Sequence, residues 1–255
     1  MSGYQEWKGT NKYSGKFFSI LGDSISTLDG YNPEGYRVFY TKDICRQIQI
    51  QGIEDTWWGK VIDFFDGKLL VNDSWSGSRV TRLDYGMPLF PSGCSDERTR
   101  GLHVNDVKPD VIIVYMGTND WGYGVRLQGK KNGLFSFFKS DETIFSTAYE
   151  KMLSKLKKNY PVAEIWCCTL CETFMSSKQS FEFPQSFGGI HIELYNQIIR
   201  DLSFRYGCKL IDLYSCHFPY DSIDGSHPNL EGMKILAKLM CHSIVDDCKG
   251  IRTWQ

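Results

Sequence analysis

Five short runs of apolar residues recur along the chain, and each is nearly continuous instead of alternating apolar with polar positions. Runs of this kind are typical of parallel strands that are covered on both faces of a sheet. The predicted strands are Phe17–Leu21, Lys68–Val71, Val111–Met116, Glu164–Thr169 and Lys209–Leu213.

Amphipathic stretches with helical spacing separate and follow these runs. In the last stretch Met233, Leu236 and Met240 share one face, and Lys234 and Lys238 lie on the other. Because strands and helices alternate, we expect an α/β fold with a parallel sheet and helices on both sides. The predicted helices are Thr56–Phe65, Thr143–Lys158, Ile192–Tyr206 and Leu230–Val245.

Polar residues gather directly after the predicted strands. In open parallel sheets, ligands bind beyond the carboxyl ends of the strands, so we expect these residues to share one edge of the sheet. In strand order they are Asp23-Ser24, Asn72 to Arg79, Gly117 to Asp120, Cys171 to Thr173, and finally Asp224 with His227.

Three of these residues supply the parts of an activated serine. A serine hydroxyl is a poor nucleophile until a base removes its proton, and His227 is the candidate base for Ser24. Asp224, three residues earlier, is placed to accept a hydrogen bond from the other ring nitrogen of His227. Pro228 favours an extended backbone at His227, which predicts a loop just before the last helix.

Negative charge that develops on an acyl oxygen needs hydrogen-bond donors. The backbone N–H of Ser24, the backbone N–H of Gly77 and the side-chain amide of Asn119 are the candidates. Glycine allows close approach of a backbone N–H to a ligand. These three groups predict an oxyanion hole.

Four short segments of the chain resemble the four sequence blocks of the SGNH hydrolases, also called GDSL-type esterases and lipases. The matching segments are Gly22-Asp23-Ser24, Asn72-Asp73-Ser74-Trp75-Ser76-Gly77, Gly117-Thr118-Asn119-Asp120 and Asp224-Gly225-Ser226-His227. The resemblance covers about residues 17 to 245. In the second block many members have Asn-Ala-Gly, where this chain has Asn72-Asp73-Ser74.

The resemblance implies a three-layer α/β/α sandwich with a flavodoxin-like, five-stranded parallel sheet. It also implies Ser24 as nucleophile, His227 as base and Asp224 as the residue that orients His227. The oxyanion hole would consist of Ser24, Gly77 and Asn119. No cofactor or metal is implied, and Asp23 and Asp120 are expected to have structural roles.

The composition narrows the class of protein. The 255 residues carry 29 Lys and Arg against 30 Asp and Glu, interspersed, which argues against a nucleic-acid partner. No apolar run approaches the roughly 20 residues of a membrane span. Residues 1–16 lack an apolar signal segment. The chain has nine cysteines, and this odd number indicates reduced thiols. We therefore expect a cytoplasmic protein. Without a linker or repeat, we expect one domain over residues 1–255, with its core at about 17–245.

Two long aromatic loops and two weaker motifs leave alternatives open. The loops 29–58 and 121–145 could act as lids or binding loops, or could cover small cores of their own. The segment from Gly124 to Lys131 is close to a phosphate-binding loop but has Lys131 in place of the required hydroxyl. Cys167, Cys168 and Cys171 lack a second pair of metal ligands at suitable spacing.

We therefore expect a serine esterase that works through an acyl-enzyme, on short acyl groups such as O-acetyl esters of carbohydrates. Hydrolysis of lysophospholipids or thioesters remains open, as does a catalytically silent glycan-binding module of the same fold. The sequence does not determine the oligomeric state.

Overall fold

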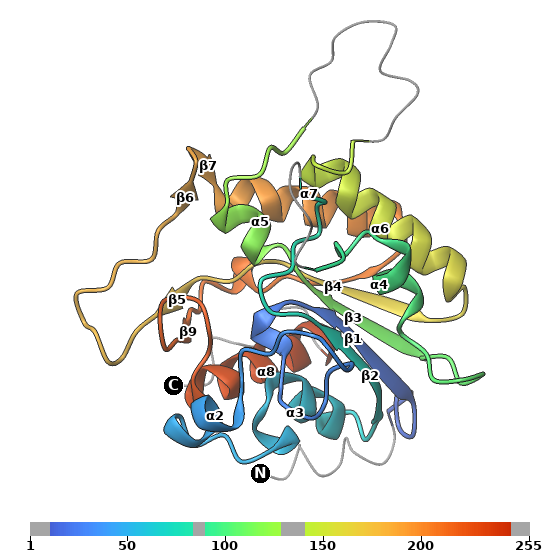
Figure 1. Ribbon diagram of the computed structural model, residues 1–255, viewed down its shortest axis with the longest axis horizontal. Helices are drawn as coiled ribbons and strands as arrows, with labels where there is room; N and C mark the ends of the chain where they lie inside the picture. Colours follow the sequence, from blue (N-terminus) through green and yellow to red (C-terminus); the bar gives the residue numbers. More distant parts are fainter. Residues whose placement is uncertain (1–10, 84–89, 129–140, 246–255) are drawn as a thin grey trace, which may run out of the picture.

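A five-stranded parallel sheet in the order β2-β1-β3-β4-β8 forms the centre of the protein (Figure 1). The computed structural model describes residues 11–83, 90–128 and 141–245. All four neighbouring pairs are parallel, and the order is that of flavodoxin. The predicted fold class is confirmed. The strands are β1 (Phe17–Gly22), β2 (Lys68–Ser74), β3 (Val111–Tyr115), β4 (Glu164–Cys168) and β8 (Lys209–Ile211).

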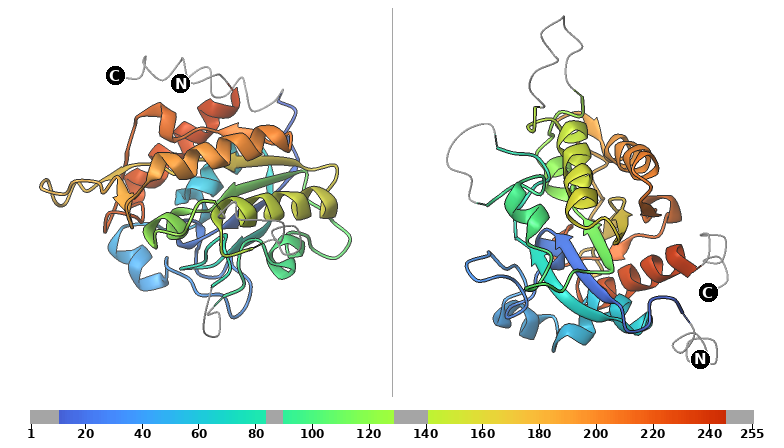
Figure 2. Two further views of the ribbon diagram at one scale, coloured as in Figure 1. Left: turned by 90° about the horizontal axis from the view of Figure 1, so that it is seen from above. Right: turned by 90° about the vertical axis from the view of Figure 1, so that its right-hand side faces the viewer.

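Helices cover both faces of this sheet, as Figures 1 and 2 show. One face carries α3 (Trp57–Phe64) and α8 (Leu230–Val245), and the other carries α6 (Phe145–Asn159) and α7 (Ile192–Arg205), with the short α4 (Asp96–Arg100) packed on α6. Each of the four longer helices begins and ends within two residues of its predicted bounds.

The central strand β3 shows why the strand sequences are continuously apolar. Val111, Ile113 and Tyr115 pack into the core on the α3 and α8 side. Ile112 and Val114 pack into the second core, on the α6 and α7 side. Because successive side chains point to opposite faces and both faces are covered, every position of the strand is buried.

Shorter elements follow the strands and lie outside the predicted set. Two pairs of two-residue strands, β5 with β9 and β6 with β7, form small separate sheets. Their bounds are Thr173–Phe174, Tyr220–Asp221, Ser186–Phe187 and Ile190–His191. The short helices are η1 (Ser24–Ser26), α2 (Lys42–Gln47), η2 (Ile53–Asp55), α5 (Thr118–Gly122) and η3 (Tyr214–Cys216).

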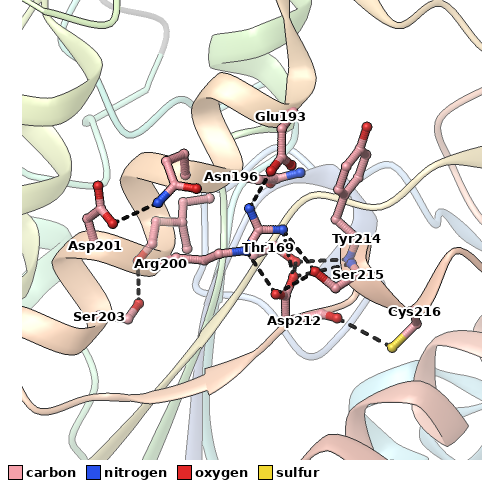
Figure 3. Close-up of polar contacts among 12 residues, drawn as sticks. Thr169, Glu193, Asn196, Arg200, Asp201, Ser203, Asp212, Tyr214, Ser215 and Cys216 are labelled. Atoms are coloured by element: carbon pink, nitrogen blue, oxygen red, sulfur yellow. Dashed lines mark hydrogen bonds and ion pairs between the residues drawn. The ribbon is translucent and has the colours of Figure 1, made fainter. Parts of the chain in front are cut away.

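A polar cluster joins α7 to the ends of β4 and β8 (Figure 3). Arg200 donates to Asp212 through Nε (2.8 Å) and Nη2 (3.1 Å), and through Nη1 to Glu193 (2.7 Å). The hydroxyl of Thr169 also donates to Asp212 (3.1 Å). Burial opposes ionisation of Asp212, but the hydrogen bonds from Arg200 and Ser215 lower its pKa below the usual value. The cluster anchors the start of the segment that runs from β8 to α8.

Candidate active site

The serine of the first block lies in a tight turn at the end of β1. The side chain of Asp23 accepts a hydrogen bond from the N–H of Ile25 (3.0 Å) and so caps the η1 turn, which begins with Ser24. Gly22 is needed here for space. A Cβ at this position would lie 2.6 Å from Oγ of Ser74 and 2.7 Å from Cβ of Ser26. The turn therefore packs directly against the end of β2.

His227 lies between Ser24 and Asp224. Its Nε2 atom is 2.8 Å from Oγ of Ser24, and its Nδ1 atom is 2.8 Å from Oδ2 of Asp224. The side chain of His227 is only 16% exposed and Ser24 only 6%, so bulk water has limited access to the pair. The structure brings together the three residues that the sequence predicted, in the arrangement that nucleophilic catalysis by serine requires.

The loop around Asp224 is held by the same carboxylate that contacts the imidazole. Oδ1 of Asp224 accepts from the backbone N–H groups of Ser226 (3.0 Å) and His227 (2.9 Å). Burial raises the pKa of Asp224, but the hydrogen bonds from the ring and backbone of His227 outweigh it and lower the pKa to about 2. Asp224 is thus ionised at neutral pH and orients His227 from one side.

The predicted oxyanion donors Gly77 and Asn119 are joined through Ser78. The Asn119 side-chain amide donates from Nδ2 to the carbonyl of Ser78 (2.9 Å), and the hydroxyl of Ser78 donates to the carbonyl of Gly22 (3.4 Å). Gly77 has φ +83°, a left-handed conformation that favours glycine. The turn at Gly77 therefore lies against the end of β1, directly before Asp23 and Ser24.

Asp120, which follows Asn119, has a structural position, as expected. Its buried carboxylate accepts from the N–H groups of Val80 (2.8 Å) and Thr81 (3.0 Å) and from the Thr81 hydroxyl (2.7 Å). Burial raises its pKa, while these hydrogen bonds oppose the rise. Asp120 thereby fixes α5, and with it Asn119, against the segment that follows Gly77.

Asp23 is an unusual neighbour for the nucleophile. Its side chain is buried, and its Oδ2 atom has no hydrogen-bond partner among the described residues. Burial raises the pKa of Asp23 to about 7, although the Ile25 hydrogen bond and the nearby His227 oppose the rise. Its structural role as the cap of η1 agrees with the prediction.

Arg98 on α4 supports the site from inside the protein and was not predicted. Its guanidinium is fully buried and donates to the carboxylate of Asp73, and also to the carbonyl oxygens of Gly22 (2.9 Å) and Asp73 (2.9 Å). Arg98 therefore connects the ends of β1 and β2. No sequence pattern indicates this pairing, because the two positions have no recognisable spacing along the chain.

Phe39 is the second residue that sequence reasoning did not place in the site. Its ring stacks on the ring of His227, with centroids 3.4 Å apart and planes 5° apart. Phe39 belongs to the aromatic loop 29–58, but the sequence does not indicate which of its aromatic residues meets the histidine. Tyr40, from the same segment, and Trp57 and Trp58, at the start of α3, are buried in the core.

A small, mostly apolar pocket lies next to these elements. It touches Gly225 and Ser226, which follow Asp224, and Thr118, which precedes Asn119. Cys171 and Thr173, two of the polar positions predicted after β4, also line it. The remaining lining residues are Trp121, Leu170, Phe183, Ile192 and Tyr220.

Part of the second aromatic loop lies outside the described residues. This holds for Phe135, Phe137 and Phe138, and for the end of the segment from Gly124 to Lys131. Trp121 lies within the described part, where it is buried and stacks on Phe183, with centroids 5.3 Å apart. No helix among the described residues is long and apolar enough to cross a membrane.

Comparison with known protein families matches the same stretch of chain. The sequence profile of the family described as GDSL-like Lipase/Acylhydrolase matches residues 16–244. The chain belongs to this family. Its members are hydrolases that act on esters, and the four predicted sequence blocks all fall within the matched region.

Solved structures of similar proteins agree with this assignment. A protein from Bacteroides uniformis named a GDSL-like lipase is 26% identical, with a TM-score of 0.66 over 90% of this chain and 95% of that one. Another from Bacteroides ovatus, named in the same way, is 25% identical, with a TM-score of 0.64 over 89% and 96% of the two chains. These GDSL-like relatives share the fold over about nine-tenths of this chain.

Two further relatives carry esterase names. A carbohydrate esterase family 2 enzyme from Corynascus thermopiles has a TM-score of 0.56 at 18% identity, over 92% of this chain and 67% of that one, and shows the fold alone. The protein named cellulase/esterase CelE from Acetivibrio thermocellus is 37% identical over 60 residues. That match spans 24% of this GDSL-like chain and only 6% of CelE.

Proposed function

We propose that this GDSL-like hydrolase is a serine esterase that forms an acyl-enzyme on Ser24 and removes short acyl groups, such as acetyl, from carbohydrates. The observation that carries the proposal is the position of His227, with Ser24 at 2.8 Å on one ring nitrogen and Asp224 at 2.8 Å on the other. A hydroxyl, an imidazole and an ionised carboxylate in this order form a nucleophile, a base and an orienting group.

In the first half of the reaction, Nε2 of His227 accepts the proton of Ser24 while Oγ attacks the ester carbonyl carbon. The carbonyl π electrons move to oxygen and give a tetrahedral oxyanion. The oxyanion then collapses, the bond to the alcohol oxygen breaks, and the imidazolium returns its proton to the leaving alcohol. Asp224 holds the ring in the required tautomer and stabilises the imidazolium.

In the second half, water replaces the serine hydroxyl as the attacking group. His227 accepts a proton from water, and the hydroxide oxygen attacks the acyl carbon. The second oxyanion collapses, the bond to Oγ breaks, and the imidazolium returns the proton to Ser24. The carboxylic acid leaves, and the enzyme is restored with all atoms and protons balanced.

The N–H groups of Ser24 and Gly77 and the amide of Asn119 are the proposed donors to both oxyanions. One support is that the Asn119 amide donates to the carbonyl of Ser78, which follows Gly77. The Ser78 hydroxyl donates to the carbonyl of Gly22. Donors that are fixed before the reaction do not need to reorganise when the charge forms, and each is typically worth about 100- to 1,000-fold in rate.

Three features support a small acyl group on a carbohydrate. A small, mostly apolar pocket is lined by Thr118 and Gly225, the sequence neighbours of Asn119 and Asp224. Half-buried Tyr36 and Trp75 pack together, with ring centroids 4.1 Å apart, and Trp75 lies two residues before Gly77. The partial relative CelE bears the names of both a cellulase and an esterase. Aromatic faces beside polar donors suit a sugar ring.

A hydrolysis panel tests the function and its substrate class together. Wild-type protein and Ser24→Ala are compared on nitrophenyl esters from acetyl to palmitoyl and on acetylated oligosaccharides. The proposal predicts hydrolysis of acetyl esters by the wild type only. Cleavage of long-chain or lysophospholipid esters alone would overturn the substrate class. Absence of hydrolysis on every substrate, with binding of the oligosaccharides retained, would indicate a silent glycan-binding module instead.

A further inference from the structure

The face of the proposed base is covered by an aromatic ring that belongs to none of the four family blocks. Phe39 lies parallel to His227, with ring centroids 3.4 Å apart and an interplanar angle of 5°. Phe39 is half-buried and comes from the segment between η1 and α2. The contact joins the first aromatic loop to the last block of the chain.

The backbone of Phe39 is tied to the nucleophile itself. Its N–H donates to Oγ1 of Thr27 (3.0 Å), and the Thr27 hydroxyl donates to the carbonyl of Ser24 (2.9 Å). Both Ser24 and Thr27 are buried. Two hydrogen bonds therefore connect the backbone of the nucleophile to the residue whose ring lies on the base.

The next residue, Tyr40, holds the other side of this contact. Its buried hydroxyl donates to the carbonyl of Pro228 (2.8 Å), the residue that follows His227. Its ring meets that of His227 edge-on, with centroids 6.5 Å apart and planes at 77°. Phe39 and Tyr40 thus contact one face and one edge of the imidazole and bind the backbone beside it.

Both hydrogen bonds of His227, to Ser24 and to Asp224, must lie in the plane of the imidazole. Rotation of the ring out of this plane weakens both at once, because hydrogen bonds weaken steeply as they bend. A flat ring in contact with the whole imidazole face opposes that rotation. An aliphatic side chain fills space but offers no matching flat surface.

We propose that Phe39 is a positioning residue for His227, which holds the imidazole in the plane that contains Ser24 and Asp224. Its electron-rich face also attracts the positive charge that His227 acquires when it takes the serine proton. Phe39 contributes to the chemical step through the base and does not contact the scissile bond. The expected effect on kcat rests on the proposed esterase function. The contact between Phe39 and His227, in contrast, is present in the protein without substrate.

The test compares Phe39→Leu with Phe39→Tyr and with a control variant from the same loop. Tyr31→Leu removes an aromatic ring that packs near Trp58, with centroids 5.9 Å apart, and is 42% exposed. We expect Phe39→Leu to lower kcat on nitrophenyl acetate by about 10- to 100-fold with little change in KM, because small misplacement of a catalytic group has effects of this size. Phe39→Tyr and Tyr31→Leu should stay within a few-fold of wild type.

A second measurement does not depend on catalysis. The proton shared by Nδ1 of His227 and Asp224 should give a low-field proton resonance in the wild type and in Phe39→Tyr. In Phe39→Leu it should broaden or disappear, while Tyr31→Leu retains it. Thermal unfolding of each variant checks that the fold is intact.

Three outcomes would overturn the inference. One is a Phe39→Leu variant with wild-type kcat and an unchanged low-field resonance. Another is an increase in KM alone, which would make Phe39 a substrate-binding surface. The third is equal loss of activity in Phe39→Leu and Phe39→Tyr, because the conservative ring would then fail to rescue. If the wild type hydrolyses no ester, the esterase proposal fails, and the resonance alone decides the role of Phe39.

Discussion

Nε2 of His227 lies 2.8 Å from Oγ of Ser24, although 203 positions separate the two residues in the chain. Ser24 begins the turn after β1, near the centre of the sheet, and His227 lies in the loop before α8. The parallel sheet brings these distant segments to the same edge. The contact therefore depends on the whole fold, and its chemistry depends on the groups that hold it in place.

The orienting role of Asp224 predicts the effect of removing its charge. Asp224→Asn retains an oxygen for the backbone N–H groups of Ser226 and His227, so the loop should keep its shape. The variant can no longer hold the required tautomer, and we expect kcat to fall by roughly 1,000- to 10,000-fold. Steady-state kinetics measures the loss, with the exposed Asp43→Asn as the control. A rate near that of the wild type would contradict the role.

Removal of the Asn119 amide should lower kcat and leave KM little changed. We expect Asn119→Ala to lower kcat by about 100- to 1,000-fold, because one of the proposed oxyanion donors is removed. Asn159→Ala is the matched control, because the Asn159 amide also donates to a backbone carbonyl at 2.9 Å, that of Thr99. If both variants lose the same activity, Asn119 has only a structural role.

The buried carboxyl of Asp23 predicts a dependence of stability on pH. Its pKa is raised from 3.8 to about 7 in the folded protein. The folded state therefore binds the proton more tightly, and this contribution to stability is complete below about pH 4 and is lost as pH rises through about 7. Asp23→Asn lacks this titration, so the stability of the wild type relative to the variant should fall with rising pH.

Urea unfolding at pH 5 and pH 8 measures this difference. The free energy of unfolding of Asp23→Asn, minus that of the wild type, should increase toward pH 8, by no more than about 1.4 kcal/mol per pH unit. A difference that is the same at both pH values would show that Asp23 titrates normally in the folded state.

The buried pair of Arg98 and Asp73 predicts a large effect on stability. Arg98→Met leaves the Asp73 carboxylate without its charged partner and removes the donor to the Gly22 carbonyl. We expect the free energy of unfolding to fall by about 3–5 kcal/mol. Arg46→Met breaks a pair on the surface, with Asp43, and should have little effect. Similar losses in the two variants would show that the buried Arg98–Asp73 pair contributes no more to stability than a surface pair.

Much of this fold could be predicted from the sequence, because burial on both faces leaves a strong pattern. All five strands and four helices follow from apolar runs and helical periodicity. The small sheet of β5 and β9 could not be predicted, because two-residue strands leave no periodic signal. The prediction of one domain over residues 1–255 and that of a cytoplasmic location stay predictions.

The candidate site also contains some residues that could be predicted from the sequence and others that could not. That Ser24, Asp224 and His227 lie together could be predicted, because an activated serine requires these residue types. Their catalytic roles stay predictions. Phe39 and Arg98 could not, because a ring that lies on a histidine or a buried cation that joins two strand ends has no required spacing along the chain. Contacts of this kind depend on how loops pack in three dimensions, and the pattern of apolar positions does not encode them.

Covalent labelling tests whether Ser24 is the nucleophile that His227 activates. Wild-type protein, Ser24→Ala and His227→Ala are treated with a fluorophosphonate, and the labelled peptides are identified by mass spectrometry. We expect one adduct in the wild type, on the peptide that contains Ser24. We expect none in Ser24→Ala and strongly slowed labelling in His227→Ala. An adduct on another residue, or labelling of Ser24 at the wild-type rate without His227, would contradict it.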